Sequence, residues 1–389
     1  MSLALASLLK TRNVRPPRCC SFSSESNPLI PVVDISSLYE DSNLRDARQR
    51  CGAELIEAAA RVGLFYVVGH GIDQRLLDQA RCYSASFFAQ PSYCKEEISI
   101  RQSPSRRGYQ RLGDNVTQGA RDQHEAIDFY RDMGLTQMGI QDDAVLASSL
   151  GPTNVGTNQW PREDDVQSLG GFRSFFEEEY VPSMLHLGAL LMRGLASGLG
   201  VSSNTFDNHF DKSFWVLRLI RYPAILSKPL PNALYGCGQH TDYGCLTIVN
   251  QDPNPSHSHC LEALIRTEDG VDEWTNVPSV PGALAVNIGD MLEHWTRDQK
   301  IKQANGGGYH QGLRATPHRI RPPSKKCNNN GRISVPFFFE PNYDAVIRPL
   351  PTMTNKAVGS KATESIIYGS YLLQKVSNNF PGVNGSIVE

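Results

Sequence analysis

The chain has 389 residues, of which 40% are hydrophobic and 20% are charged, as in an ordinary globular protein with a sizeable core. Its 38 basic and 40 acidic residues give a formal net charge of −2, which excludes a broad cationic surface for nucleic acid and argues against a polybasic membrane binder. No apolar run is long enough to span a bilayer, and the nine cysteines include no CxxC pair, so we expect free thiols in a reducing compartment.

The N-terminal segment is basic and rich in serine. It carries four basic residues and no acid before Glu25. This composition fits an organelle transit peptide, and it equally fits an untargeted tail. Residues 1–27 are therefore expected to be a disordered or transit segment. The protein is expected in the cytoplasm, or in a mitochondrion or plastid if the segment is a transit peptide.

The first half of the chain is predicted to be mainly helical. Apolar residues recur there at helical spacing, and glycine, proline and capping residues mark the ends of the periodic segments. The predicted elements, in order, are a short strand at 30–35, a helix at 46–62, a buried strand at 64–68, a helix from Asp73 to about Gln90, and a long helical pattern at 171–200 in which Pro182 is expected to introduce a kink.

Beyond Ser213 the hydrophobic pattern changes to short β-rich runs bounded by turn residues. Helices that come first and strands that cluster later predict an α+β fold, and many short antiparallel strands favour a jelly roll or barrel. Two polar insertions, 253–259 and 303–311, are predicted to be surface loops. The predicted strands are 215–222, 246–250, 283–288 and 333–339.

His240-Thr241-Asp242 is the first candidate for chemistry. In an extended strand, residues two apart point to the same face, so an imidazole and a carboxylate would converge as a metal requires. The pattern alone is weak, because the chain has ten histidines and a second match at 209–211 without supporting context. Gly236 and Gly238 favour the first match, since they let the backbone turn sharply before His240.

A third ligand has to come from elsewhere in the chain. His318 lies between β-like runs, and His294 and His310 are its rivals. Two histidines and one carboxylate would leave coordination positions open, as in the facial triad of non-haem Fe(II) oxygenases. A closed structural zinc site would prefer four protein ligands, with cysteine among them.

Arg332-Ile333-Ser334 is the second candidate, in a strongly apolar segment. The guanidinium and the hydroxyl would share one face of a strand. A buried arginine needs an anion, and its planar fork suits a carboxylate. The alternative is an arginine that pairs with an internal Asp or Glu.

Taken together, these motifs are similar to those of the 2-oxoglutarate- and Fe(II)-dependent oxygenases of the isopenicillin N synthase-like class. The resemblance spans roughly residues 29–345. The matching segments, in order, are 30–35, 63–71, Arg218-Leu219-Ile220-Arg221-Tyr222-Pro223, His240-Thr241-Asp242-Tyr243-Gly244, 281–292, 315–320 and 332–342.

The resemblance implies a double-stranded β-helix core wrapped by N-terminal helices. It implies that His240, Asp242 and His318 hold Fe(II), and that no catalytic residue is needed beyond these ligands. It also implies that 2-oxoglutarate is bound by Arg332, Ser334 and Tyr222. O₂ is the second cosubstrate, and ascorbate is an optional further reductant.

By position, the resemblance divides the chain into five parts. After the segment 1–27 come the N-terminal dioxygenase region at 28–150, a long helix and linker at 151–211, the Fe(II)/2-oxoglutarate β core at 212–345, and a C-terminal helix and tail at 346–389.

Two departures from the class are visible. Many relatives have Asn where this chain has Ile220, and the separation between Asp242 and His318 is longer than usual.

The expected activity is oxidation of a small organic metabolite by hydroxylation or desaturation, with release of succinate and CO₂. An Fe(II) oxidase of the same fold that does not use 2-oxoglutarate, and a non-catalytic jelly-roll binding protein, remain alternatives.

The expected partner is a small-molecule substrate, with no nucleic acid, no membrane and no protein partner inferable. The substrate pocket is expected to be lined by the N-terminal helices, the segment 107–117 and the C-terminal tail. The sequence identifies neither the substrate nor the oligomeric state.

Overall fold

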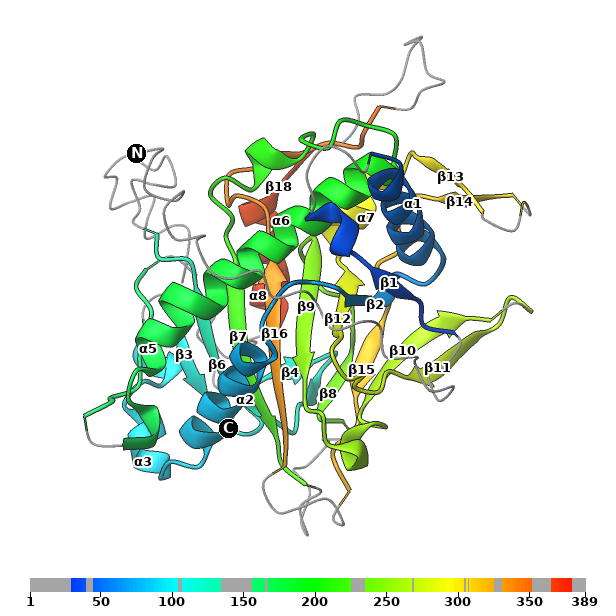
Figure 1. Cartoon of the computed structure of the whole chain (residues 1–389). Helices are drawn as coiled ribbons and strands as arrows, with labels where there is room; N and C mark the ends of the chain where they lie inside the picture. Colours follow the sequence, from blue (N-terminus) through cyan, green and yellow to red (C-terminus); the bar gives the residue numbers. More distant parts are fainter. Residues whose placement is uncertain are drawn as a thin grey trace.

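The computed structural model describes residues 29–39, 45–103, 107–133, 156–164, 167–224, 235–267, 269–303, 306, 308–324, 331–351 and 365–379. Two β-sheets form the core, and helices cover the outer face of the larger sheet (Figure 1). The predicted segment 1–27 lies outside the described residues, and the division of the chain into five parts stays a prediction. In the part of the chain that the structure describes, no helix is long and apolar enough to cross a membrane.

The larger sheet has eight strands, all antiparallel to their neighbours except for the parallel pair β1 and β2. Strands from both halves of the chain alternate in it, so the N-terminal region is part of the core. In spatial order they are β1 (Val32–Asp34), β2 (Leu64–Val68), β12 (Leu284–Ile288), β9 (Leu246–Gln251), β16 (Arg332–Phe339), β7 (Val216–Tyr222), β6 (Glu125–Tyr130) and β3 (Gly108–Gln110).

The smaller sheet has four antiparallel strands, and two of its strands carry the candidate metal ligands. Its order is β11 (Asp272–Asn276), β10 (Leu261–Arg266), β15 (His318–Ile320) and β8 (Cys237–His240). Three two-stranded ribbons lie outside these sheets: β4 (Val116–Thr117) with β5 (Ala120–Arg121), β13 (Lys300–Lys302) with β14 (Tyr309–Gln311), and β17 (Val346–Ile347) with β18 (Ile366–Ile367).

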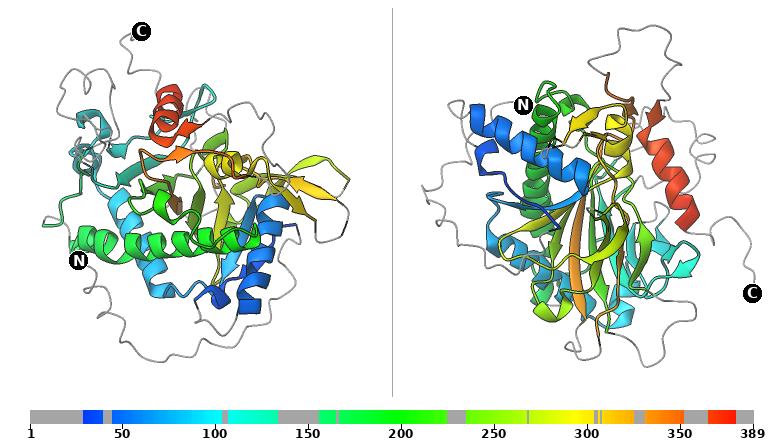
Figure 2. Two further views of the ribbon diagram at one scale, coloured as in Figure 1. Left: turned by 90° about the horizontal axis from the view of Figure 1, so that it is seen from above. Right: turned by 90° about the vertical axis from the view of Figure 1, so that its right-hand side faces the viewer.

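The helices lie on two sides of the β core. α1 and α6 pack on each other so closely that a Cβ on Gly52 would lie 2.9 Å from the carbonyl oxygen of Gly194, which is why glycine suits both positions. α8 lies on the opposite side of the strands from α6 (Figure 2). The helices are α1 (Arg45–Arg61), α2 (Gln74–Phe88), α3 (Ser92–Glu96), α5 (Phe172–Ser174), α6 (Val181–Gly198), α7 (Asp290–Thr296) and α8 (Tyr368–Asn379), with short 3₁₀ turns η1 (Ser36–Leu38), η3 (Ile100–Gln102), η5 (Gln167–Leu169), η7 (Asp207–His209) and η8 (Pro255–His257).

The long helical pattern at 171–200 contains a segment of π-helix that the sequence did not predict. Phe175–Tyr180 form a π-helical segment, η6, and Pro182 stands in the first turn of α6 that follows it. A proline lacks the backbone N–H that would bond to the preceding helical turn, and a π segment is an irregularity at which a helix can omit such a bond. The wider π turn thus accommodates Pro182.

The insertion 253–259 is only partly a surface loop. His257 in η8 is buried, and its Nδ1 lies 2.9 Å from Oδ2 of Asp252. The insertion 303–311 includes β14, which pairs with β13 in a two-stranded ribbon. The expectation of an irregular surface loop is therefore wrong for His257, because Asp252 gives its ring a buried hydrogen-bond partner.

Along the central strands, alternate residues face the apolar core and the candidate site. Leu217 and Leu219 of β7 belong to the apolar core under the helices, whereas Arg218 and Tyr222 line cavities on the other face of the sheet. The same period of two recurs in β16, where Val335 and Phe337 are core residues. The inner faces of β6, β7 and β16 therefore form one wall of the candidate site.

Candidate functional site

Two imidazoles and a carboxylate meet between the two sheets. His240 ends β8 and His318 begins β15, and the two residues are paired directly in the antiparallel ladder. Their ring centroids are 4.3 Å apart, and the Nε2 atom of each ring lies 3.7 Å from Oδ1 of Asp242. The ligand atoms of all three residues lie within 4.8 Å of one another.

Hydrogen bonds orient both rings for metal binding. Nδ1 of His240 lies 2.8 Å from the carbonyl oxygen of Gly238, and Nδ1 of His318 lies 3.1 Å from that of Thr316. A carbonyl oxygen only accepts, so Nδ1 must donate and the lone pair is left on Nε2. Both lone pairs are therefore on the nitrogens nearest Asp242, as a metal ligand pair requires.

Asp242 is buried, and the larger sheet holds its second oxygen. Oδ2 accepts hydrogen bonds from Thr247 Oγ1 at 2.5 Å and from Asn287 Nδ2 at 2.6 Å. Burial alone would raise the pKa of this carboxyl, but His318 and His240 together with these two hydrogen bonds hold the pKa below its ordinary value. Asp242 is thus a carboxylate that turns Oδ1 toward the two imidazoles.

The rival histidines lie elsewhere. His294 is in α7, with its Nδ1 3.3 Å from an Arg297 nitrogen, and His310 is in β14. Among the described residues, the group of His240, Asp242 and His318 is the one whose side chains come close enough to share a metal ion. His209, from the second H-x-D match, lies outside this group, and its ring packs on Trp295 with the ring centroids 4.8 Å apart.

An inner cavity of about 90 Å³ adjoins the three candidate ligands, and Arg332, Ser334 and Tyr222 all line it. Arg332 is only 2% exposed, and neither terminal guanidinium nitrogen has a hydrogen-bond partner among the described residues. Its Cζ lies 5.3 Å from the centroid of the Tyr222 ring. The alternative of an internal Arg–carboxylate pair is not borne out, and a buried cation without a partner fits an anionic ligand.

Ile220 also lines the inner cavity. Its apolar side chain provides no hydrogen bond where many relatives have Asn. The polar side chains of Thr247 and Asn287, which line the same cavity, are already bonded to Asp242. The inner cavity as a whole fits a metal with a keto-acid: three oriented ligands on one side, and an uncompensated guanidinium behind them.

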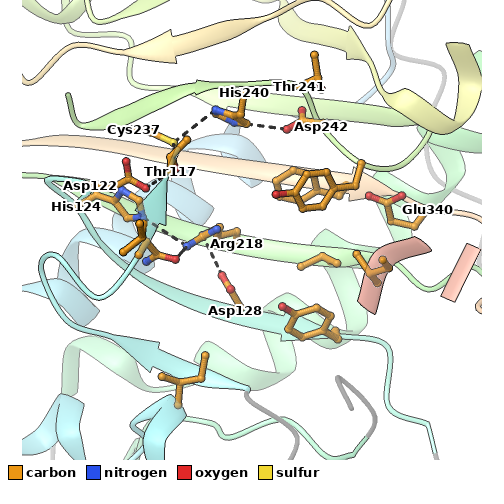
Figure 3. A pocket seen from close by; sticks show the side chains of 18 of the residues that line it. Thr117, Asp122, His124, Asp128, Arg218, Cys237, His240, Thr241, Asp242 and Glu340 are labelled. Atoms are coloured by element: carbon orange, nitrogen blue, oxygen red, sulfur yellow. Dashed lines mark hydrogen bonds and ion pairs between the residues drawn. The ribbon is translucent and has the colours of Figure 1, made fainter. Parts of the chain in front are cut away.

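A larger outer cavity of about 200 Å³ shares His240 and Asp242 with the inner cavity, and Figure 3 shows its labelled lining residues. Sequence reasoning missed most of its polar wall. His124 and Asp128 of the β6 segment and Arg218 of β7 line it, together with Glu340, which follows β16. The sequence did contain a signal for this wall, because His124, Asp128 and Tyr130 lie at even spacing on one face of a strand that carries Ile127 and Phe129 on the other.

The predicted lining of the outer cavity needs a correction. The segment 107–117 contributes three residues, among them Thr117, and α8 contributes Tyr368 and Leu372. In the described chain, however, α1 and α2 contribute none, and Ile100 of η3 is the N-terminal helical residue that reaches the cavity. The reason is that α2 packs on the outer face of the larger sheet, against β16 and β7.

Known proteins share this architecture over nearly the whole chain. The crystal structure of a full-length Neurospora crassa protein in complex with alpha-KG aligns at a TM-score of 0.69 and 25% identity, covering 91% of this chain and 98% of that one. JOX2 in complex with 2OG, Fe and JA aligns at a TM-score of 0.62 and 24% identity, covering 89% and 84%, which supports the fold alone. The expected α+β fold with a double-stranded β-helix core is confirmed.

Sequence relatives point the same way. A homoarginine-6-hydroxylase of Glycine max is 37% identical, over 90% of this chain and 97% of the relative, and one of Arabidopsis thaliana is 34% identical over the same shares. The family model described as the N-terminal region of a non-haem dioxygenase in morphine synthesis matches residues 30–163, and that of the 2OG-Fe(II) oxygenase superfamily matches 215–341. The chain therefore belongs to the 2OG-Fe(II) oxygenase superfamily and is a dioxygenase that depends on Fe(II) and 2-oxoglutarate.

Proposed function

We propose that this dioxygenase hydroxylates a small guanidino amino acid of the homoarginine type. In this proposal His240, Asp242 and His318 hold the iron, and Arg332, Ser334 and Tyr222 hold 2-oxoglutarate. The observation that carries the site assignment is the buried, unpartnered guanidinium of Arg332 beside three converging metal ligands. The substrate class is supported by the homoarginine-6-hydroxylases, which match this chain over almost their full length.

The iron, when bound, supplies the oxidising chemistry that couples conversion of 2-oxoglutarate and O₂ to succinate and CO₂ with insertion of one oxygen atom into a C–H bond. The protein holds its ligands in place for that task. The backbone carbonyls of Gly238 and Thr316 keep both imidazoles in one tautomer. Thr247 and Asn287 keep Asp242 ionised and fix its rotamer, so that no ligand has to reorganise.

Arg332 binds the distal carboxylate of 2-oxoglutarate. Its two terminal nitrogens form a planar fork that matches two carboxylate oxygens, and Ser334 adds a hydroxyl from the same face of β16. The Tyr222 ring packs beside the guanidinium at 5.3 Å and restricts its orientation. Binding of the anion removes the cost of a buried cation without a partner.

The outer cavity receives the amino-acid substrate. It opens onto His240 and Asp242, so a ligand there can present a C–H bond to the metal position. Its wall contains Asp122, Asp128 and Glu340 against one arginine, Arg218. This excess of carboxylates favours a substrate that carries a positive charge.

Succinate release on addition of L-homoarginine to the iron-loaded protein tests the proposal. We expect succinate and hydroxylated product in equal amounts, and loss of both in the Asp242→Ala variant, which should also fail to retain iron. Arg332→Gln should raise the KM for 2-oxoglutarate by about 100-fold, because it leaves a buried carboxylate without its cation. Arg266→Gln, an exposed position of β10, is the control for the loss of one arginine.

Other outcomes would contradict the proposal. If Asp242→Ala bound iron and turned over normally, the ligand assignment would be wrong. If homoarginine were consumed without succinate, the enzyme would be an Fe(II) oxidase of the same fold. If the protein neither bound iron nor consumed 2-oxoglutarate, the non-catalytic alternative would stand.

A further inference from the structure

Glu340 is a buried carboxylate in the wall of the outer cavity. It follows the last residue of β16, is 3% exposed, and its Oε2 has no hydrogen-bond partner among the described residues. Burying a carboxylate oxygen without a partner is costly, so such a group calls for a ligand or another explanation. Figure 3 shows Glu340 apart from the Arg218–Asp128 pair, on another side of the same cavity.

The other acidic side chains of the outer cavity are already engaged. Asp122 accepts hydrogen bonds from the backbone N–H of Gly238 at 2.9 Å and from Thr117 Oγ1 at 2.7 Å. Asp128 accepts from Gln110 Nε2 at 2.6 Å, and its Oδ1 lies 3.1 Å from Nε of Arg218. Both carboxylates therefore have structural partners before any substrate arrives.

The cationic side chains near the cavity are engaged as well. Arg218 pairs with Asp128 and donates to Gln110 at 2.9 Å and to Asn115 at 3.0 Å. Burial lowers the pKa of His124 to about 3, so that ring is neutral. Within the described part of the wall, Glu340 thus has no cation committed to it.

The loop that carries the metal ligands makes room for this carboxylate. A Cβ on Gly244 would collide with the carboxyl group of Glu340, so the position two residues after Asp242 accommodates no side chain. Gly244 therefore brings Glu340 against the ligand-bearing loop. A group bound by Glu340 would lie close to the metal position.

We propose that Glu340 is the specificity-determining residue of the outer cavity and binds the guanidinium end of the substrate. This inference rests on the function proposed above. A guanidinium that binds there displaces the proton of Glu340, and the resulting carboxylate accepts from the planar guanidinium fork in a buried site whose low dielectric strengthens the pair. In homoarginine, carbon 6 carries the guanidino group, so a guanidinium held beside the ligand loop brings that end of the molecule to the metal.

Two ligands that differ in charge and hardly in shape test the inference. Homocitrulline is homoarginine with a neutral ureido group in place of the guanidinium. Binding is measured by calorimetry on wild-type and Glu340→Gln proteins loaded with Fe(II) and 2-oxoglutarate without oxygen, and kcat/KM is measured in air. We expect the wild type to prefer homoarginine by at least about 30-fold and the variant to lose most of that preference, with homocitrulline affinity within about threefold of wild type.

Control variants separate charge from folding. Glu273→Gln, an exposed position of β11, should keep the wild-type preference. Glu340→Asp retains the charge on a shorter side chain and should keep part of the preference, which loss of packing alone would not explain. It also keeps the inference testable if Glu340→Gln does not fold.

The outcomes distinguish the two proposals. If wild type releases succinate with homoarginine but Glu340→Gln discriminates as strongly as wild type, the role of Glu340 is overturned and the proposed function stands. If wild type neither binds nor oxidises homoarginine and prefers homocitrulline, both the guanidino substrate and the role of Glu340 are wrong.

Discussion

Replacing Glu340 with glutamine should stabilise the metal-free protein, and the gain should grow with pH. Burial raises the pKa of the Glu340 carboxyl to about 8, and the lowering effects of Tyr368 and of the Cys245 backbone N–H are smaller. The unfolded chain releases this proton near the ordinary pKa of 4.5, whereas the folded protein retains it to about 8. Between these values the folded state binds more protons, so its stability falls as pH rises.

The size of the effect follows from the two pKa values. Each unit between pH and the ordinary pKa is equivalent to about 1.4 kcal/mol. Relative to acidic solution, the wild type should therefore lose about 3 kcal/mol of unfolding free energy by pH 7 through this group, and about 5 kcal/mol above pH 8. Glutamine has the same shape and does not titrate, so the variant should lose none of it.

Urea unfolding of both proteins between pH 5 and pH 8, in a chelator, measures the difference. At pH 5 the carboxyl is largely protonated in the folded state and only weakly penalised, so that pair of measurements is the control. The variant should gain about 3 kcal/mol over wild type between pH 5 and pH 8. A difference that is constant with pH, or a variant that becomes less stable than wild type at pH 8, would refute the reasoning.

Three further predictions concern the metal ligands and their surroundings. Thr247→Val removes one hydrogen bond to Oδ2 of Asp242 and should weaken Fe(II) binding about 10- to 100-fold in a metal titration. Unchanged affinity would mean that Asn287 alone positions the carboxylate. Gly244→Ala should lower the unfolding free energy by about 2 kcal/mol, because the added methyl group collides with Glu340. In a Glu340→Ala background the loss should be much smaller, and an equal loss in both backgrounds would exclude that contact. Fe(II) at about a hundred times its Kd should raise the unfolding free energy by about 2.7 kcal/mol, reversibly with chelator, and no shift would mean that no preformed site exists.

Local features of the fold were predictable because their causes are local. The apolar run at 64–68 matches β2 residue for residue, and Asp73 caps α2 by accepting from the backbone N–H of Arg75. The spacing of two residues also predicted that the side chains of Arg332 and Ser334 lie on the same face of a strand, as they do in β16. These predictions required no knowledge of which strands are neighbours.

The surroundings of the site were not predictable in the same way. The bond from Asn287 to Asp242 joins residues 45 positions apart, and it exists only because β12 faces the loop after β8. The fit of Glu340 against Gly244 likewise depends on how β16 approaches that loop. The preference for His318 over His294 rested on a family resemblance, and the direct pairing of β15 with β8 is the physical reason it holds.

The two cavities beside the candidate iron ligands present uncommitted groups of opposite type, a guanidinium in the inner cavity and a titratable carboxyl in the outer one. The inner cavity contains the unpartnered guanidinium of Arg332, and the outer cavity contains the uncommitted oxygen of Glu340, while His240 and Asp242 line both. A dianionic keto-acid is therefore attracted inward. When Glu340 is ionised, above about pH 8 or with a cation bound beside it, the outer wall repels the keto-acid and attracts a cationic substrate. Each ligand is directed to its own side because the wrong placement would leave two like charges together in a low-dielectric space. Reversing either charge should consequently disturb the sorting of both ligands, which is why a variant at Glu340 has to be judged on its 2-oxoglutarate KM as well as on its substrate preference.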